Sequence, residues 1–242
     1  MLYYAATGRS ISSQVLNTCR QSFNNALSGD TLMRSSITTI QALLIASLNT
    51  DSHSTSLGSS GSAIWLRSGT AIRMAQDLAL HKETPNATPE ENNKRRRIWA
   101  MVVIMDRWAA CAHGLPMTIN LIDCDVLLPS PHPDDQTTLT GDVEINRPYL
   151  YLIEMVKGSV FLGRILQTLY CAVGLRLVNE EQIYELSNEV DLWRDELPDD
   201  LKFKGINSNV QAGTLQLSYV TLCLLLYRPM MRGASNDQDG EF

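Results

Sequence analysis

Apolar residues recur at intervals of three and four along most of this chain, and this spacing constrains its fold more than any other feature. Three-to-four spacing is the period of an α-helix with one buried face. No stretch alternates apolar and polar residues for long enough to predict a β-sheet. The 242-residue sequence therefore predicts an all-α fold, a multi-helix array of packed antiparallel helices.

Several stretches carry the helical pattern. They cover residues 11–27, 37–48, 62–80, 88–114, 148–177, 179–198 and 210–228. Gly158, Gly163 and Gly174 make a break of the helix possible inside 148–177. The last stretch is apolar on most faces, which predicts a buried helix. Its most apolar part, 215–227, is shorter than a bilayer requires, so no membrane is expected.

The helix over 88–114 has the clearest ends. Thr88 is followed by Pro89 and, three residues after the cap, by Glu91, which forms a capping box with proline at the first helical position. Gly114 and Pro116 are typical of the residues that end a helix.

Two stretches between the helices predict irregular structure. Residues 49–62 are rich in serine and glycine, and residues 115–146 contain several prolines. We expect one domain over residues 1–232 that is incomplete at its N-terminus, followed by a polar tail over 233–242.

The charge balance argues against DNA binding by this chain alone. It carries 20 Lys and Arg against 26 Asp and Glu, a net charge of −6, and such a surface repels phosphate on average. Its five cysteines are odd in number and far apart, so no disulfide framework is implied and an intracellular, reducing compartment is expected.

Candidate metal ligands are few. Cys111, His113, Cys124 and Asp125 carry the right atoms for zinc, but a tight pair such as Cys-x2-Cys is missing. The alternative is a buried thiol at a helix end beside a solvent-facing histidine. We therefore expect no metal and no cofactor in this chain.

Catalytic patterns are equally weak. The aspartate pairs at 134–135 and 199–200 lack a third carboxylate at helical spacing, so we expect them to be solvated turn residues. No glycine-rich phosphate loop follows a strand, and no serine or cysteine stands in a nucleophile motif. The sequence predicts that the chain is not an enzyme.

Three further patterns each leave two interpretations open. The basic run over 94–97 fits nuclear import or phosphate binding, but four residues inside a helix cannot all face one way. Leu222, Leu225 and Leu226 have the spacing of a coactivator-type motif, although core packing explains them better. The apolar seam over 183–197 fits pairing with another chain, although packing within the domain is the preferred interpretation.

Several strings are similar, in order and spacing, to the motifs of the fungal-specific transcription factor domain, also called the middle homology region. They are residues 65–82, which resemble its signature helix, and residues 95–107, 114–129, 197–201 and 217–229. The likeness covers most of 1–230. The motif residues, which we expect to be structural, are Trp65, Gly69, Arg73, Met74, Asp77, His81, Arg96, Arg97, Trp99, Asp106, Arg107, Gly114, Pro116, Asp125 and Pro129.

The resemblance implies a nuclear regulatory domain that controls transcription by RNA polymerase II. Full-length members carry an N-terminal cluster of six cysteines around two zincs that reads DNA, and no such cluster is visible in this sequence. DNA binding and zinc are therefore implied only for a missing domain of the parent protein. A small-molecule effector, a coregulator protein and a homodimer stay open as partners, and a free-standing helical interaction or metabolite-binding module is the alternative function.

The sequence departs from the family pattern at three positions. Ala79 stands where glycine is usual, Ala100 where a second tryptophan is common, and Leu115 where arginine is frequent. These departures do not indicate which subgroup of the family the chain resembles most.

The apolar faces of 62–80 and 88–114 predict that these helices pack together as an antiparallel pair. We expect Arg73 to be buried there and drawn towards Asp77 or Asp106, in an ionic network between the two helices. Gly69 would let the two backbones approach closely.

Overall fold

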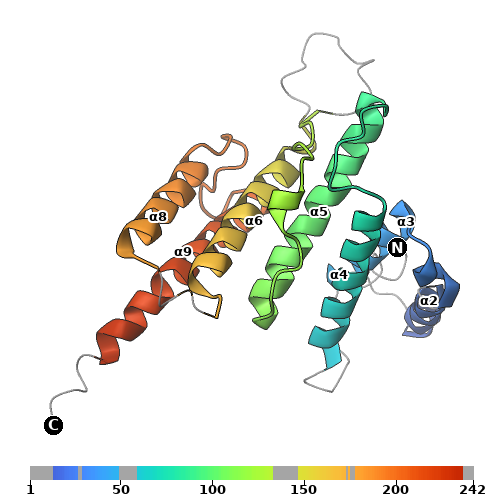
Figure 1. The fold of residues 1–242 in the computed structure, drawn as a ribbon, viewed down its shortest axis with the longest axis horizontal. Helices are drawn as coiled ribbons and strands as arrows, with labels where there is room; N and C mark the ends of the chain where they lie inside the picture. Colours follow the sequence, from blue (N-terminus) through green and yellow to red (C-terminus); the bar gives the residue numbers. More distant parts are fainter. Residues whose placement is uncertain are drawn as a thin grey trace. The chain divides into compact units, whose positions relative to one another are not determined.

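The computed structural model describes residues 13–26, 29–48, 59–132, 147–172, 174 and 178–236. All regular structure in these ranges is helical, which confirms the predicted all-α class. The elements, labelled in Figure 1, are α2 (Ser13–Ala26), the 3₁₀ turn η1 (Gly29–Met33), α3 (Ile37–Leu48), α4 (Ser59–Asp77), α5 (Pro89–His113), the 3₁₀ turn η2 (Leu121–Asp123), α6 (Leu150–Leu169), α8 (Glu180–Asp195) and α9 (Val210–Asn236).

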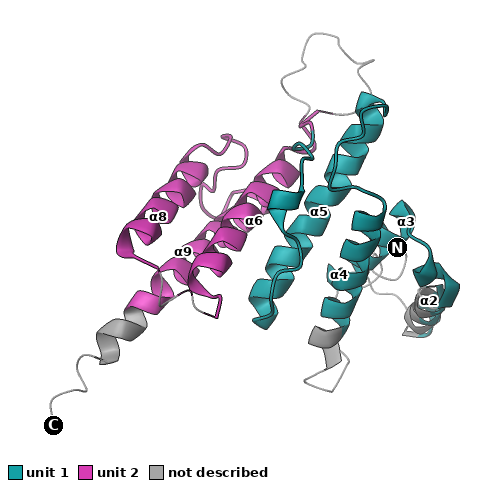
Figure 2. Ribbon diagram, in the orientation of Figure 1, with its two compact units in different colours: residues 1–129 teal, residues 130–242 magenta. Residues whose placement is uncertain are grey.

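The chain forms two compact units, residues 1–129 and 130–242, shown in Figure 2. Unit 1 holds α2 to α5 and the irregular segment after α5, and unit 2 holds α6, α8 and α9. The single domain over 1–232 stays a prediction. The predicted polar tail begins inside α9, because that helix continues to Asn236, and residues 237–242 lie outside the described residues.

In unit 1 the core lies between α3, α4 and α5. Figure 1 shows α4 and α5 side by side and running in opposite directions, and the two helices are in contact, which confirms the predicted pair. Ile40 of α3, Ala71 and Ala75 of α4 and Val102 of α5 are fully buried. Small alanines on α4 allow its neighbours to pack closely against it.

Helix α5 begins and ends as the sequence predicts. The Thr88 side chain accepts from Glu91 N, the Glu91 side chain accepts from Thr88 N, and Pro89 is the first helical residue. Gly114 ends the helix in the left-handed region at φ 64°. A helix with both ends fixed in this way gives the unit a rigid axis.

In unit 2, α6 packs against α8 and α9. Helix α6 continues through Gly158 and Gly163 and ends at Leu169, so the possible break inside 148–177 lies after Leu169. A Cβ on Gly158 would lie 2.9 Å from the Trp193 ring, so the glycine makes room for that tryptophan. Trp193 Nε1 donates to the buried carboxylate of Glu154 at 3.0 Å.

Helix α9 differs from its prediction in length and burial. It continues to Asn236 with Pro229 inside it, and only one of its faces is buried. That face includes Leu222 and Leu226, both 0% exposed, which confirms core packing for two leucines of the coactivator-like motif, whereas the third, Leu225, is half-buried. By length and mean hydropathy alone, residues 210–230 would be able to cross a membrane. The sequence-based expectation considered the shorter stretch 215–227, which is too short to do so.

Candidate functional site

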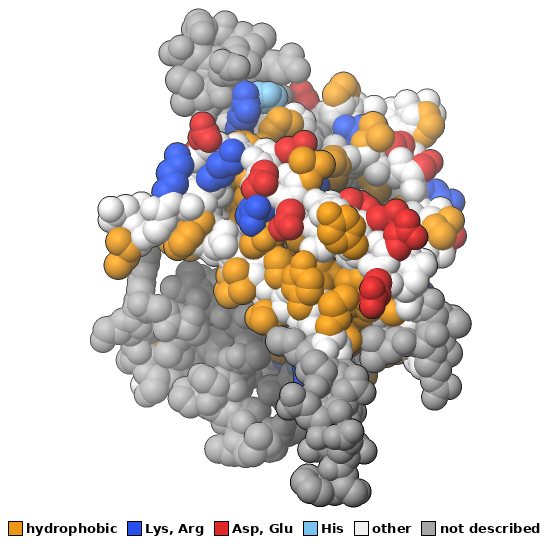
Figure 3. Space-filling model, turned by 90° about the vertical axis from the view of Figure 1, so that its left-hand side faces the viewer, with side chains coloured by type: hydrophobic (Ala, Val, Ile, Leu, Met, Phe, Trp, Pro, Cys, Tyr) orange, Lys and Arg blue, Asp and Glu red, His pale blue; other side chains and the backbone are white. Residues whose placement is uncertain are grey.

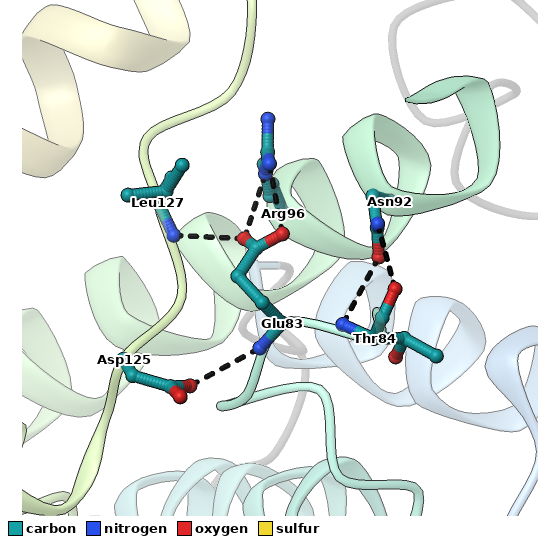
Figure 4. A network of polar contacts seen from close by, with 6 residues as sticks. All are labelled: Glu83, Thr84, Asn92, Arg96, Asp125 and Leu127. Carbon is teal, nitrogen blue, oxygen red and sulfur yellow. Dashed lines mark hydrogen bonds and ion pairs between the residues drawn. The ribbon is translucent and has the colours of Figure 1, made fainter. Parts of the chain in front are cut away.

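Three of the motif strings, 65–82, 95–107 and 114–129, meet in unit 1, where α4 ends, α5 begins and the segment after α5 returns, whereas 197–201 and 217–229 lie in unit 2. Figure 4 shows the centre of this polar network, the Glu83 carboxylate. It accepts two hydrogen bonds from Arg96, from Nε and Nη2 at 2.8 Å each, and one from Leu127 N at 2.9 Å. One side chain therefore joins the α4–α5 connection, α5 and the irregular segment.

Neighbouring contacts close this network. Glu83 N donates to Asp125 Oδ1 at 3.1 Å, and Asp125 N donates to the His81 carbonyl at 3.2 Å. Asn92 Nδ2 donates to Thr84 O at 3.0 Å, and Thr84 N donates to Asn92 Oδ1 at 3.3 Å. The connection between the helices is thus held to α5 and to the segment around Asp125 by side chains.

The Glu83–Arg96 pair is electrostatically matched. The hydrogen bonds from Arg96 lower the pKa of Glu83, and the hydrogen bond to Glu83 raises the pKa of Arg96. Their side chains are 25% and 21% exposed, so water screens the pair only in part. Both groups stay charged at neutral pH, and the carboxylate has no role as a proton donor there.

The C-terminal end of α4 is satisfied by an arginine of α5. Arg95 Nη2 donates to the carbonyls of Leu78 at 3.0 Å and Ala79 at 2.8 Å. Ala79 itself lies at φ 51°, in the left-handed region that favours glycine. The position where the family resemblance places glycine is therefore one where the backbone favours it.

A second, buried network fixes the segment after α5. Arg107 Nη1 bonds to Asp106 Oδ2 at 2.5 Å, and Arg107 Nη2 donates to Ile119 O at 2.9 Å. Asp106 accepts from Thr118 N at 2.9 Å and Ile119 N at 3.1 Å. Each of the two charged residues is 1% exposed. This pair holds irregular backbone against α5.

Burial shifts the pKa values of Arg107, Cys111 and Cys124 towards the uncharged form of each group. Desolvation lowers the pKa of Arg107, while the nearby Asp106 charge opposes that change. Burial raises the pKa of the Cys111 and Cys124 thiols. Both cysteines are therefore protonated at neutral pH, which disfavours them as nucleophiles or metal ligands.

The charged groups in both networks pair with one another or with backbone. Within the described ranges, no cluster of three or more His, Cys, Asp or Glu side chains is arranged to hold a metal ion. The arrangement is suited to fixing the positions of α4, α5 and the segment 115–129, a structural task. The expected absence of a metal or cofactor stays a prediction.

Two predictions about the α4–α5 contact are wrong. Arg73 is exposed, and its Nη1 donates a hydrogen bond to Gln76 Oε1 at 3.1 Å rather than to Asp77 or Asp106. Asp106 is paired with its neighbour Arg107 instead. A Cβ on Gly69 would meet nothing within 4 Å, so this glycine is not required by a close approach of the helices.

The other motif residues divide into buried and exposed ones. Met74, Trp99 and Pro129 are buried, and the His81 and Trp99 rings lie 5.8 Å apart. Trp65 and Arg97 are half-buried, whereas Asp77, Pro116 and Asp125 are exposed. The structural role of the set stays a prediction, and the networks described above are its main physical support.

The basic run at 94–97 does not form one cationic face. Arg95 and Arg96 are engaged with the end of α4 and with Glu83, Arg97 is half-buried, and Lys94 is exposed. A phosphate would have to displace these contacts from the two arginines. The geometry therefore disfavours the phosphate-binding interpretation.

Sequence reasoning missed Glu83 and Asn92. Neither lies at a helical core position, and a glutamate in a short connection gives no periodic signal. A usable signal was nearby, because a basic run at the start of an apolar helix needs carboxylate or carbonyl partners. The connection over 78–88 before that helix contains Glu83 as its single acid.

The comparisons identify the family of the chain. The sequence model described as "Fungal specific transcription factor domain" matches residues 9–195. The chain is 26% identical over 208 residues to the acetamidase regulatory protein of Aspergillus fumigatus, covering 84% of this chain and 25% of that protein. It is 28% identical over 173 residues to the transcription factor phm2 of Pyrenochaetopsis sp, covering 63% of this chain and 22% of that protein.

A third relative is the Activator of stress genes 1 of Saccharomyces cerevisiae, 25% identical over 186 residues, covering 72% of this chain and 19% of that protein. The chain thus spans about a quarter or less of the length of these relatives. No solved structure matches it. The prediction that the chain is not an enzyme agrees with a family and relatives that are transcription regulators. The chain belongs to the fungal specific transcription factor domain family.

Proposed function

We propose that this chain is the regulatory domain of a fungal transcription factor and acts on transcription by RNA polymerase II. The observation that carries the proposal is the family match over residues 9–195. The charge networks support it, because the carboxylates of Glu83 and Asp106 are paired with arginines and bonded to backbone, as in a structural scaffold. Such a scaffold suits a domain that works through contacts with other molecules.

DNA recognition is assigned to another part of the parent protein. The net charge of −6 opposes phosphate binding, and the arginines of the basic run have partners within the chain. The relatives are at least about four times the matched length, which leaves room for a zinc-binding DNA-reading domain in such a parent. A nuclear location follows from the same role.

The proposed action of the domain is to restrain or permit activation, through a coregulator protein or a small-molecule effector. A direct test places residues 1–242 between an unrelated DNA-binding domain and an activation domain in a fungal reporter strain. The reporter output should differ from that of a fusion without the chain. Arg107→Ala, which breaks the buried pair, should return the output to the chain-free level.

Arg73→Ala is the matched control, because Arg73 is exposed and should leave the regulation intact. An output that is the same with and without the chain would contradict the proposed function. A separate gel-shift assay addresses DNA: the isolated chain should bind duplex DNA weakly and with strong salt dependence. Tight, sequence-specific binding at physiological salt would assign DNA recognition to this chain.

A further inference from the structure

One face of α9 is apolar and open to solvent. Leu217 is 67% exposed and Leu224 is 58% exposed, although each lies in the middle of a long helix. The opposite face carries the unit 2 core. Figure 3 views the molecule from the side of α8 and shows hydrophobic side chains gathered between acidic and basic ones. Exposed apolar surface of this kind marks an interaction site.

The open face follows a heptad repeat. Its positions, here called the α9 seam, are Val210, Gly213, Leu217, Val220, Leu224 and Tyr227, spaced alternately by three and four residues. Apart from glycine, these side chains are 40% exposed or more. A repeat of seven residues with two apolar positions is the pattern by which one helix packs along another. The pattern extends over three repeats of α9.

Gly213, in the first turn of α9, is the one small residue of the α9 seam. Glycine inside a helix costs about 0.5–1 kcal/mol relative to alanine. A Cβ at this position would meet nothing within 4 Å, so no contact described within the chain requires the glycine. The open space at this position leaves room for a large side chain of a neighbouring helix.

The charge pattern favours a second copy of this chain as the partner. Between Val210 and Tyr227 the sequence has no Asp, Glu, Lys or Arg. Two copies of the α9 seam therefore meet without like-charge repulsion or buried unpaired charge. The exposed surface of α8, with Glu180, Glu181 and Glu185, is acidic by contrast and would repel its own copy.

We propose that α9 pairs with α9 of a second copy in an antiparallel, two-fold symmetric dimer. In that register each small residue faces a large one: Gly213 faces Leu224 of the other copy. Val210 likewise faces Tyr227, and Leu217 faces Val220. A parallel pair would instead put glycine against glycine, which leaves a void, and tyrosine against tyrosine.

Tyr227 is held in place for this role. Its hydroxyl hydrogen-bonds with Ser187 Oγ at 2.6 Å on α8, while 44% of the residue stays exposed. A two-fold axis near the middle of the α9 seam brings all six positions into contact at once. The dimer surface goes beyond the proposed regulatory function and does not depend on it.

Sedimentation equilibrium on the full 242-residue chain tests the proposal. The wild type should show a reversible monomer–dimer equilibrium. Leu217→Glu places two carboxylates at the interface and should weaken the dimer on the order of a hundredfold. Leu192→Glu on α8 is the matched control, because Leu192 is 58% exposed like Leu224, and it should leave the equilibrium unchanged.

A swap of residues tests the register. Gly213→Leu should weaken the dimer, because the new side chain meets Leu224 of the other copy. The double variant Gly213→Leu/Leu224→Gly should restore association, because the small and large positions are exchanged. Circular dichroism checks that each variant keeps its helix content. The antiparallel register would be overturned if Leu217→Glu dissociates the dimer but the double variant fails to restore the association that Gly213→Leu weakens.

Three results would overturn the dimer itself. The first is a wild type that stays monomeric at high concentration. In that case, a melting temperature of Leu217→Glu below that of the wild type would show that another part of the same chain covers the α9 seam. A dimer that survives Leu217→Glu is the second, because its interface would lie elsewhere. Flotation of the wild type with phosphatidylcholine vesicles is the third, because α9 is long enough to enter a membrane.

Discussion

The two units contain ion pairs with different roles. In unit 1, Asp106 and Arg107 are buried, and both bond to the backbone of the irregular segment at Ile119. In unit 2, Arg164 and Glu189 pair across α6 and α8 with side chains 45% and 46% exposed. The first pair holds backbone in place, and the second links two helices at the surface.

The difference follows from where the backbone finds its hydrogen bonds. A helix satisfies its own N–H and C=O groups, so helices α6, α8 and α9 need few charged partners in their core. The segment 115–129 is mostly irregular, and its buried backbone groups need side-chain partners. The buried charges of unit 1 therefore bond to backbone where regular structure is missing, whereas the buried Glu154 of unit 2 accepts from a side chain, Trp193 Nε1.

Removing Arg107 should have the largest effect. Arg107→Ala leaves the buried Asp106 carboxylate without its cation, which should lower the free energy of unfolding by about 3–5 kcal/mol. Urea denaturation measures the change. Arg107→Lys should recover part of the loss, because it keeps the charge but not the second bond to Ile119 O. A variant as stable as the wild type would show that the pair is not structural.

Replacing Glu83 should have a smaller effect that depends on pH. Glu83→Gln removes the charge from a partly exposed pair and should cost about 1–2 kcal/mol at neutral pH. Because Arg96 lowers the pKa of Glu83 in the folded state, its contribution is present above the unfolded pKa, near 4.3, and is lost as the pH falls through the folded value. The difference between variant and wild type should therefore shrink below about pH 4.

Glu189→Gln is the matched change in unit 2. The hydrogen bond from Arg164 also lowers the pKa of Glu189, so the sign of the pH dependence is the same. The pair is more exposed, and its removal should cost less than that of Glu83 at neutral pH. Equal losses for Glu83→Gln and Glu189→Gln would contradict the contrast between the two units.

Ala79→Gly should stabilise the chain. Glycine relieves the left-handed conformation of Ala79, and this gain is partly offset by the larger freedom of glycine in the unfolded chain, which leaves about 0.5–1 kcal/mol. Ala112→Gly, at an exposed position in the last turn of α5, relieves no such conformation and should instead lower stability slightly. Thermal melts that move in the same direction for both variants would contradict the assigned backbone strain.

Arg73→Ala should have the smallest effect. Its guanidinium is exposed and bonds to Gln76 one helical turn away, so the loss should stay below about 0.5 kcal/mol. The same measurement separates the structure from the sequence-based prediction, which placed Arg73 in a buried network. A large drop in melting temperature would restore that earlier interpretation.

The helices were predictable because their signals are local. Thr88 and Glu91 determine the start of α5, and Gly114 its end, through contacts within a few residues. The partner of a charged side chain is a non-local property. Periodicity placed Arg73 and Asp106 near the same helix pair, but the side-chain directions that separate them depend on the packed structure.

Burial of α9 shows a similar limit. Its sequence is apolar on most faces, and composition cannot say which face packs on α6 and α8 within the unit. The structure buries Leu215, Leu222 and Leu226 and exposes Leu217 and Leu224. The sequence predicts that this whole helix is buried, because it does not reveal how many neighbouring helices pack against it.

Amide hydrogen exchange at Thr118 and Ile119 tests the central claim most directly. Both amides lie outside regular structure and donate to the buried Asp106 carboxylate. If the motif charges hold the segment 115–129 against α5, these amides should exchange as slowly as those in the middle of α5, and Arg107→Ala should speed their exchange. Exchange in the wild type at the rate of an unprotected peptide would contradict the account.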